Sequence, residues 1–144
     1  IKPDGIVKSL VGNIITAFSE TKLKIVGAKI VNVSKELAEK HYAGLRETRP
    51  EIFKEVMEYI TGKKHKTPRV MALVYKGENA IEKVREICGE TNPEKASPIS
   101  LRGKYGRINS ETNVMENVVH ASDSAENAEK EIALWFQEHE IAKD

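Results

Sequence analysis

The sequence predicts one globular domain, residues 1–144, in which helices and strands alternate irregularly. The chain has 144 residues, of which 40% are hydrophobic, and this is enough to bury a real core. Apolar residues recur at helical spacing in several segments, whereas residues 23–33 and 70–76 have the composition of strands. No repeat of about 20 to 50 residues and no low-complexity tract divides the chain.

The first segment predicts a turn followed by a helix. Residues 2–5, KPDG, combine a proline and a glycine in the manner of a turn, and residues 10–18 then place apolar side chains at helical spacing. The chain opens at Ile1, which lies inside a predicted element. We therefore expect that most of a first strand is absent from the sequence.

A bent strand and two helices follow. Residues 23–33 alternate in two phases that change near Gly27, which predicts a long strand with a bulge. Ser34 is placed to cap a helix that reaches Leu45, and a second short helix is predicted around residues 53–60.

The second half predicts a buried strand, a helix, a long loop and a final strand and helix. After a basic loop at residues 62–69, the strand at 70–76 leads to a helix at 79–88 that Gly89 is placed to end. The segment from Gly89 to Asn113 has no regular period and is longer than most connections, so we expect it to be functional. Residues 114–119 predict a strand, and Asp123 or Ser124 is placed to cap a helix that includes residues 128–135.

Charge and cysteine content narrow the classes of function. Lys and Arg total 23 against 22 for Asp and Glu, so the net charge of +1 gives no general reason to bind nucleic acid or a membrane surface. Cys88 is the single cysteine, and the sequence has no basic and apolar leader and no apolar run long enough to span a membrane. These features favour a protein of the reducing cytoplasm.

His120 is the residue most open to a chemical role. A histidine between a strand and a helix can project into a cleft for catalysis, although its position alone favours a structural role. Glu131 lies two turns into the following helix, where it can orient the imidazole, and Ser122 can donate a hydrogen bond nearby. Considered alone, Glu131 and Ser122 are each interpreted as an ordinary surface or capping residue.

Several ordered motifs resemble those of the nucleoside diphosphate kinases. Residues 117–124, NVVHASDS, together with Glu131 and the WF pair at 135–136, are similar to the active-site signature of that family. The resemblance continues in IKPDG at 1–5, HY at 41–42 and GETNP at 89–93, and so covers almost the whole chain.

The resemblance implies a ping-pong transfer of phosphate. His120 would take the γ-phosphoryl group from a nucleoside triphosphate and pass it to another nucleoside diphosphate, with Glu131 and Ser122 supporting the ring. The alternative within the same fold is a non-catalytic nucleotide-binding module. A nucleic-acid-binding domain that uses the basic loop at 62–69 is less favoured, because the chain lacks an aromatic stacking strip.

The same resemblance assigns the nucleotide-binding positions. Without it, Arg85 would be a cation at a helix end and Arg102 a solvated charge in the long loop. The chain has no glycine-rich Walker loop, so side chains must hold the phosphates. The positions that match the family's phosphate, sugar and base contacts are Lys2, Tyr42, Phe53, Arg85, Thr91, Arg102, Val114 and Asn117.

The family also implies a fold, a cofactor and an assembly. The fold is an α+β ferredoxin-like βαββαβ sandwich, in which helices cover a four-stranded antiparallel sheet. Mg²⁺ would bind through the phosphates with little help from protein carboxylates, and the chain would form a homo-oligomer, either a hexamer or a tetramer. His41, His65 and His139 show no spacing typical of a metal site, and Cys88 is predicted to be an apolar filler.

The chain departs from the family pattern in three places. An extra residue or two near positions 47–55 shifts Phe53 from the usual aromatic position, and the loops at 62–69 and 103–116 are longer than usual. Glu116 stands where the family usually has a basic residue before the asparagine. These changes bear on how the nucleotide enters and how tightly it binds, not on the chemistry at His120.

Overall fold

The centre of the fold is an antiparallel pair of strands, β1 (Lys24–Asn32) and β2 (Arg69–Lys76). The computed structural model describes residues 1–111 and 113–143, so Thr112 and Asp144, the last residue of the expected domain, lie outside the described residues. The register shifts between Ile25 and Gly27, which confirms the predicted bulge. A Cβ added at Gly27 would lie 3.0 Å from Ile141 and 3.2 Å from Phe136, so a larger residue there would require these side chains to shift.

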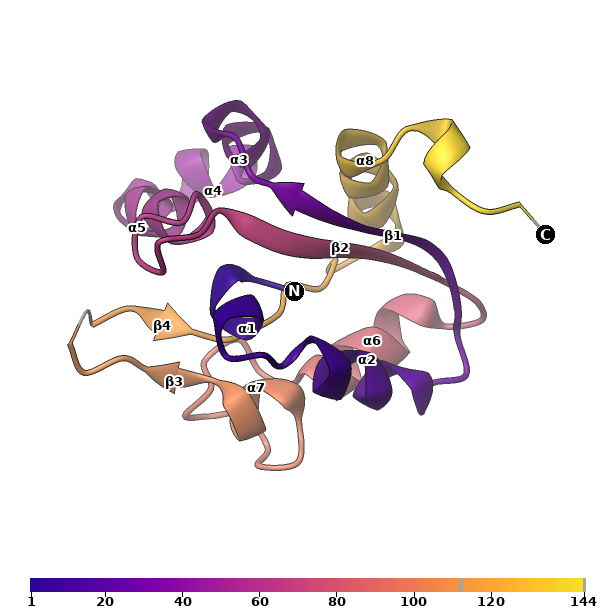
Figure 1. Cartoon of the computed structure of the whole chain (residues 1–144), viewed down its shortest axis with the longest axis horizontal. Helices are drawn as coiled ribbons and strands as arrows, with labels where there is room; N and C mark the ends of the chain where they lie inside the picture. The colour runs from indigo at the N-terminus through magenta and orange to yellow at the C-terminus, as the bar shows by residue number, and fades with distance from the viewer. Residues whose placement is uncertain (112, 144) are drawn as a thin grey trace.

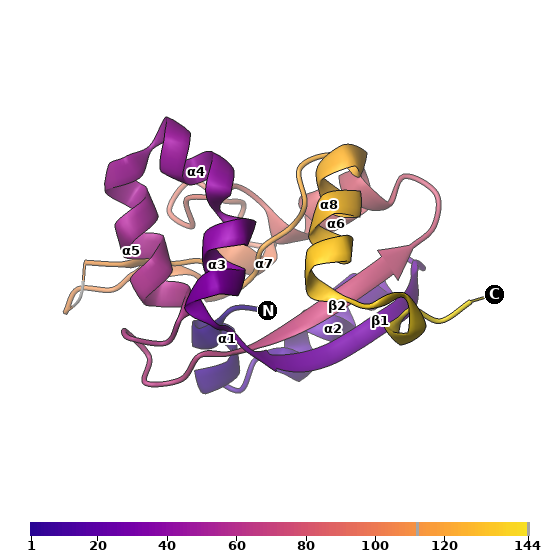
Figure 2. The same cartoon turned by 90° about the horizontal axis from the view of Figure 1, so that it is seen from above.

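Helices lie on both sides of this pair (Figure 1). One side carries α3 (Lys35–His41), α4 (Ala43–Thr48), α5 (Pro50–Ile60) and α8 (Ala125–Trp135), and the other carries α2 (Val11–Ser19), α6 (Ala80–Cys88) and α7 (Leu101–Tyr105). Figure 2 shows α3 and α8 next to each other, and these two helices are in contact. A short helix, α1 (Pro3–Val7), contacts β2, and a 3₁₀ turn at Glu138–Glu140 follows α8.

Alternate residues of β2 serve opposite sides of the core. Val74 packs with Val26 and Phe136 on the α8 side, whereas Tyr75 packs against the cluster that contains Phe18 and Val119. This alternation is what a strand buried on both faces requires.

The helix boundaries follow local chemistry that the sequence predicts. The Ser34 hydroxyl accepts from the Leu37 amide at 3.1 Å, and the Ser124 hydroxyl accepts from the Asn127 amide at 3.1 Å. Gly89 ends α6 with φ at +79°, the conformation that favours glycine. These three predicted boundaries are confirmed.

Three local predictions are corrected. The expected turn at residues 2–5 belongs to α1, because Pro3 at the first helical position presets φ for a helix. The helix that begins after Ser34 was expected to reach Leu45, but α3 ends at His41 and a separate helix, α4, begins at Ala43. The predicted irregular segment after Gly89 contains α7, which Ser100 caps by accepting from the Gly103 amide at 3.2 Å.

The described strands form two separate two-stranded sheets. The second sheet pairs β3 (Arg107–Ile108) with β4 (Met115–Glu116), so the strand predicted at 114–119 is only two residues long. Residues 1–2 bridge the gap beside β2: the Met71 amide donates to the Ile1 carbonyl at 3.1 Å, and the Lys2 amide donates to the Val118 carbonyl at 2.9 Å. The α+β class is confirmed, and hydrogen bonds place residues 1–2 between β2 and Val118.

No helix among the described residues is long and apolar enough to cross a membrane.

Candidate active site

His120 lies in the segment between β4 and α8, with 39% of its side chain exposed. Its Nε2 atom is 3.0 and 3.1 Å from the two carboxylate oxygens of Glu131, and the Ser122 hydroxyl donates to the same carboxylate. Burial alone would raise the pKa of Glu131, but the hydrogen bonds with His120 and Ser122 and the charge of His120 lower it below its ordinary value. The structure thus brings together the three residues predicted to be catalytic.

His41 is a neighbour of His120 that sequence reasoning left out of the site. The two rings meet edge to face with centroids 4.7 Å apart, and the Trp135 indole donates to His41 Nδ1 at 3.0 Å. Burial, reinforced by the charge of His120, lowers the pKa of His41 to about 4, so this ring is neutral at physiological pH. The sequence places His41 on the apolar face of a helix, and a buried histidine needs a hydrogen-bond partner. That partner is Trp135, which only the folded structure identifies.

One group of potential metal ligands occurs among the described residues. His41, His120 and Glu131 each offer an atom within 4.8 Å of the others. Two imidazoles and one carboxylate are a poor set for Mg²⁺, which prefers oxygen ligands. Hydrogen bonds from Trp135 and Ser122 also engage His41 and Glu131.

A second set of predicted residues forms a hydrogen-bonded chain beside this centre. Lys2 Nζ donates to Asn117 Oδ1 at 2.7 Å, and Asn117 Nδ2 donates to the Thr91 carbonyl at 2.9 Å. Burial, and then the charge of Arg102, lowers the pKa of Lys2 to about 8. Lys2, Thr91 and Asn117 come from distant parts of the sequence and are joined here.

Arg102 is anchored inward. Its guanidinium donates to the Gly89 carbonyl at 2.8 Å and to the Val119 carbonyl at 3.1 Å, and the residue is only 7% exposed. The reading of Arg102 as a solvated loop charge is therefore wrong. Arg85, by contrast, is exposed on the last turn of α6.

The remaining predicted contacts lie around α4 and α5. The ring of Tyr42 meets His41 edge to face at 4.6 Å, and burial raises the pKa of its hydroxyl. Val114, 3% exposed, lines a hollow together with residues of α5, whereas Phe53 does not line that hollow and instead packs under the Arg46 guanidinium at 4.8 Å. Tyr42 is thus placed at the centre, and the structure does not bring Phe53 and Val114 together around one hollow.

The basic loop at 62–69 is engaged in local ion pairs. Lys63 and Lys64 lie 2.6 and 3.4 Å from the Glu58 carboxylate, and His65 Nε2 lies 2.9 Å from the buried Glu116. Glu116 also accepts from Lys8 at 2.7 Å. Much of the loop's charge is therefore directed at the protein itself.

Comparison with known proteins places this geometry in context. The family described as "Nucleoside diphosphate kinase" matches residues 1–141. The chain is 49% identical over 141 residues to a nucleoside diphosphate kinase of Pyrococcus abyssi, an alignment that covers 98% of this chain and 83% of that protein. It is 43% identical over 141 residues to one of Oceanobacillus iheyensis, which covers 98% and 87% of the two chains.

Solved structures agree with the sequence relatives. One is described as a transition state mimic of the Borrelia burgdorferi nucleoside-diphosphate kinase with bound vanadate and ADP; it matches with a TM-score of 0.88 and 32% identity, over 100% of this chain and 88% of that one. A nucleoside diphosphate kinase of Encephalitozoon cuniculi matches with a TM-score of 0.84 and 36% identity, over 100% and 90%.

Proposed function

The chain belongs to the nucleoside diphosphate kinase family of phosphotransferases, and we propose that it carries the transferred phosphoryl group on His120. The observation that supports this role is the contact of both Glu131 oxygens with His120 Nε2. Because the pKa of Glu131 is lowered, this carboxylate is ionised and can only accept, so Nε2 carries the proton. The lone pair of the neutral ring is then on Nδ1, which is the nucleophile.

The reaction has two balanced steps. In the first, a bond forms between His120 Nδ1 and the γ-phosphorus while the bond from that phosphorus to the β,γ-bridging oxygen breaks, and the nucleoside diphosphate leaves with the bridging oxygen. In the second, a terminal oxygen of another nucleoside diphosphate attacks the phosphorus and releases the imidazole. Glu131 and Ser122 hold the ring in one tautomer and one orientation through both steps.

Positive charge and fixed donors are proposed to bind the phosphates. Lys2, Arg85 and Arg102 supply the cations, and their placement before reaction lowers the cost of the charge that develops on the equatorial oxygens. Mg²⁺ bound through the nucleotide phosphates would neutralise part of their charge. The other proposed nucleotide contacts are Tyr42, Thr91, Asn117, Val114 and Phe53.

We further propose that the chain forms one domain with the ferredoxin-like βαββαβ arrangement. In support, hydrogen bonds give the spatial order β1, β2, residues 1–2 and Val118, with residues 1–2 in the place of the first strand. The assembly proposed is a homo-oligomer, a hexamer or a tetramer, in the cytoplasm.

The proposal is tested by incubating the purified protein with γ-labelled ATP and Mg²⁺ without an acceptor. We expect a label that is labile to acid and stable to alkali, and that any added nucleoside diphosphate removes. His120→Ala should abolish the label while leaving ADP binding largely intact, whereas Arg102→Ala should weaken both. His139→Ala, on the 3₁₀ turn, is the matched control and should label normally.

Two outcomes would contradict the proposal. Exchange by His120→Ala at near wild-type rate would exclude His120 as the phosphate carrier. Wild-type protein that binds ATP but never takes the label would instead be a non-catalytic nucleotide-binding relative.

A further inference from the structure

The backbone just before His120 contains a strained turn at Val118. Val118 has a φ of +56°, a conformation that a β-branched residue rarely adopts. The Val119 amide donates to the Asn117 carbonyl at 2.7 Å, which closes a three-residue γ-turn around Val118. This turn separates two residues of the site, Asn117 and His120, and its conformation sets how they face each other.

The turn is held from outside by the start of α1. One carboxylate oxygen of Asp4 accepts from the Val118 amide at 3.1 Å, and the Lys2 amide donates to the Val118 carbonyl at 2.9 Å. The Tyr59 hydroxyl donates to the other oxygen of Asp4, and Lys8 Nζ lies 3.8 Å from the carboxylate. Both polar groups of the strained residue are thus bonded to residues about 115 positions away in the sequence.

Asp4 is completely buried, and such a carboxylate is costly unless its oxygens are bonded. We propose that Asp4 is a positioning residue for phosphoryl transfer, because its carboxylate holds the strained turn that fixes Asn117 and His120. This inference rests on the proposed role of His120.

Relaxation of the turn would disturb two parts of the site at once. A valine without the Asp4 bond would return to a negative φ, which rotates the peptide groups on both sides of Val118. The Val119 carbonyl that anchors Arg102 belongs to this segment, as does the Asn117 side chain that links Lys2 to Thr91. Misplacement of reacting groups by about 1 Å can slow a transfer about 100-fold.

The test measures the single-turnover rate of His120 labelling by saturating γ-labelled ATP in four variants. Asp4→Asn should label about 10- to 100-fold more slowly, because the amide retains the shape but binds the Val118 and Tyr59 donors less well. Val118→Gly removes a fully buried side chain and should lower stability, but the folded protein should label at close to the wild-type rate, since glycine adopts a positive φ without strain. The double variant Asp4→Asn/Val118→Gly should recover at least tenfold over Asp4→Asn.

The fourth variant separates positioning from general support of the fold. Tyr59→Phe removes a hydrogen bond to the same buried carboxylate but leaves the bond to Val118, so its rate should fall by less than about threefold. A Tyr59→Phe rate as low as that of Asp4→Asn would show that Asp4 acts only through the stability of the core.

Failure of the inference is distinct from failure of the proposed function. Wild-type labelling with an equal rate in folded Asp4→Asn, or no recovery by Val118→Gly, would overturn the role of Asp4 alone. If Asp4→Asn does not fold, the double variant is compared with Val118→Gly, and a slower double variant overturns the inference.

The absence of label on the wild-type protein would overturn the role of His120. In that case the positioning by Asp4 is tested by NMR, and it too is overturned if the shifts of the His120 ring nitrogens do not change in Asp4→Asn.

Discussion

Among individual side chains, Lys2 links the burial of the site to its pH range. Its pKa is lowered to about 8, so the cation is lost as the pH rises through that value. The affinity for ATP should therefore fall above pH 8, by up to about tenfold for each pH unit. Calorimetric titration of ATP into His120→Ala protein, which cannot accept the phosphate, measures this affinity.

Lys2→Arg in the same background is the control, because a guanidinium stays charged throughout this range. Its affinity should be nearly constant between pH 7 and pH 9, a window set by the Lys2 pKa of about 8. If the His120→Ala protein that retains Lys2 also bound ATP with constant affinity over this range, the assignment of Lys2 as a phosphate-binding cation would be contradicted.

Glu131 is predicted to act through the orientation of His120. Glu131→Gln keeps the size of the side chain but can present its amide nitrogen to Nε2, so the tautomer is no longer fixed. The rate of His120 labelling should fall by about 100-fold. Glu126→Gln on the same helix, whose carboxylate is exposed and pairs with Lys130, should leave that rate unchanged. Comparable loss in both variants would point to a general effect on α8.

The residues of the site were predictable to different degrees. The ordered motif around His120 identifies His120, Ser122 and Glu131, and the structure places all three in contact. His41 and Asp4 were not predictable as neighbours, because their partners Trp135 and Val118 lie 94 and 114 positions away. Contacts over such separations depend on the packing of whole helices, which no local pattern records.

At the level of secondary structure, Gly89 at the end of α6 packs closely against Ser100, which precedes α7. A Cβ at Gly89 would lie 2.3 Å from the Ser100 hydroxyl oxygen, and φ there is +79°. Ser100 caps the helix that carries Arg102. Gly89→Ala should therefore destabilise the protein by about 1 to 3 kcal/mol and slow His120 labelling. Urea unfolding measures the first effect.

Gly12→Ala is the matched control within α2. Nothing lies within 4 Å of a Cβ at that position, so the alanine should stabilise the protein by about 0.5 to 1 kcal/mol. If Gly89→Ala proved equally harmless, the close contact with Ser100 would not constrain the fold.

Long elements were predictable and short ones were not. The structure confirms the helices predicted from apolar periods, which are α2, α5, α6 and α8. It also confirms both strands of the central pair. α7 and β3 escaped prediction, because five residues of helix and two of strand are too few to show a period. The strand expected at 114–119 stops at Glu116, because the γ-turn at Val118 interrupts the extended backbone.

Across the molecule, the buried Glu116 joins the end of α1, the loop at 62–69 and β3. Lys8, His65 and Arg107 contact its carboxylate at 2.7, 2.9 and 3.1 Å, and Asn109 donates to it at 2.9 Å. Burial alone would raise the pKa of Glu116, but hydrogen bonds from Lys8, Asn109 and His65 lower it to about 2. Glu116 therefore stabilises the fold as an ionised group.

Glu116 should make stability depend on acid. A carboxyl whose folded pKa lies below its unfolded value of about 4.3 stabilises the fold above that pH, and the effect is lost as the pH falls toward 2. Glu116→Gln should cost about 3 kcal/mol near neutral pH, and the difference from wild type should shrink steadily below about pH 4.3. Urea unfolding at several pH values measures it.

Glu138→Gln is the control for acid stability, since that carboxylate lies on the 3₁₀ turn, is exposed and pairs with the equally exposed Lys143. Its difference from wild type should stay near zero at every pH. A constant Glu116→Gln difference between neutral pH and pH 3 would contradict the low pKa of Glu116.

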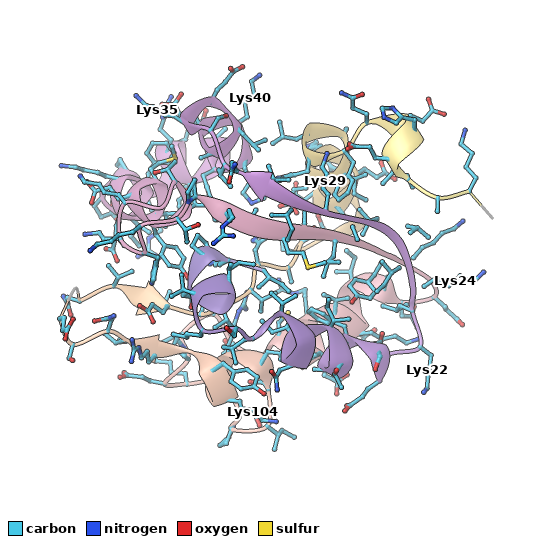
Figure 3. All side chains as sticks on the ribbon, viewed as in Figure 1. Lys22, Lys24, Lys29, Lys35, Lys40 and Lys104 are labelled. Carbon is cyan, nitrogen blue, oxygen red and sulfur yellow. The ribbon has the colours of Figure 1, made fainter. Side chains whose placement is uncertain are left out.

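Charged side chains are otherwise distributed around the surface. Figure 3 shows Lys22, Lys24, Lys35, Lys40 and Lys104 at separate places on the periphery, and Lys29 reaches toward the C-terminal segment. Lys40 pairs with Glu36 and Lys29 with Glu140. The net charge of +1 gives no general reason for a polyanion to bind.

The position of Glu131 on the last long helix has a consequence for synthesis on the ribosome. A nascent chain that ends before α8 already contains Lys2, Arg102, Asn117 and His120, but it lacks the carboxylate that fixes the imidazole and the indole that holds His41. Translation adds about 5 to 20 residues each second, so the missing helix arrives about a second later. We therefore expect catalytic competence to appear only after α8 has been made and has packed against α3.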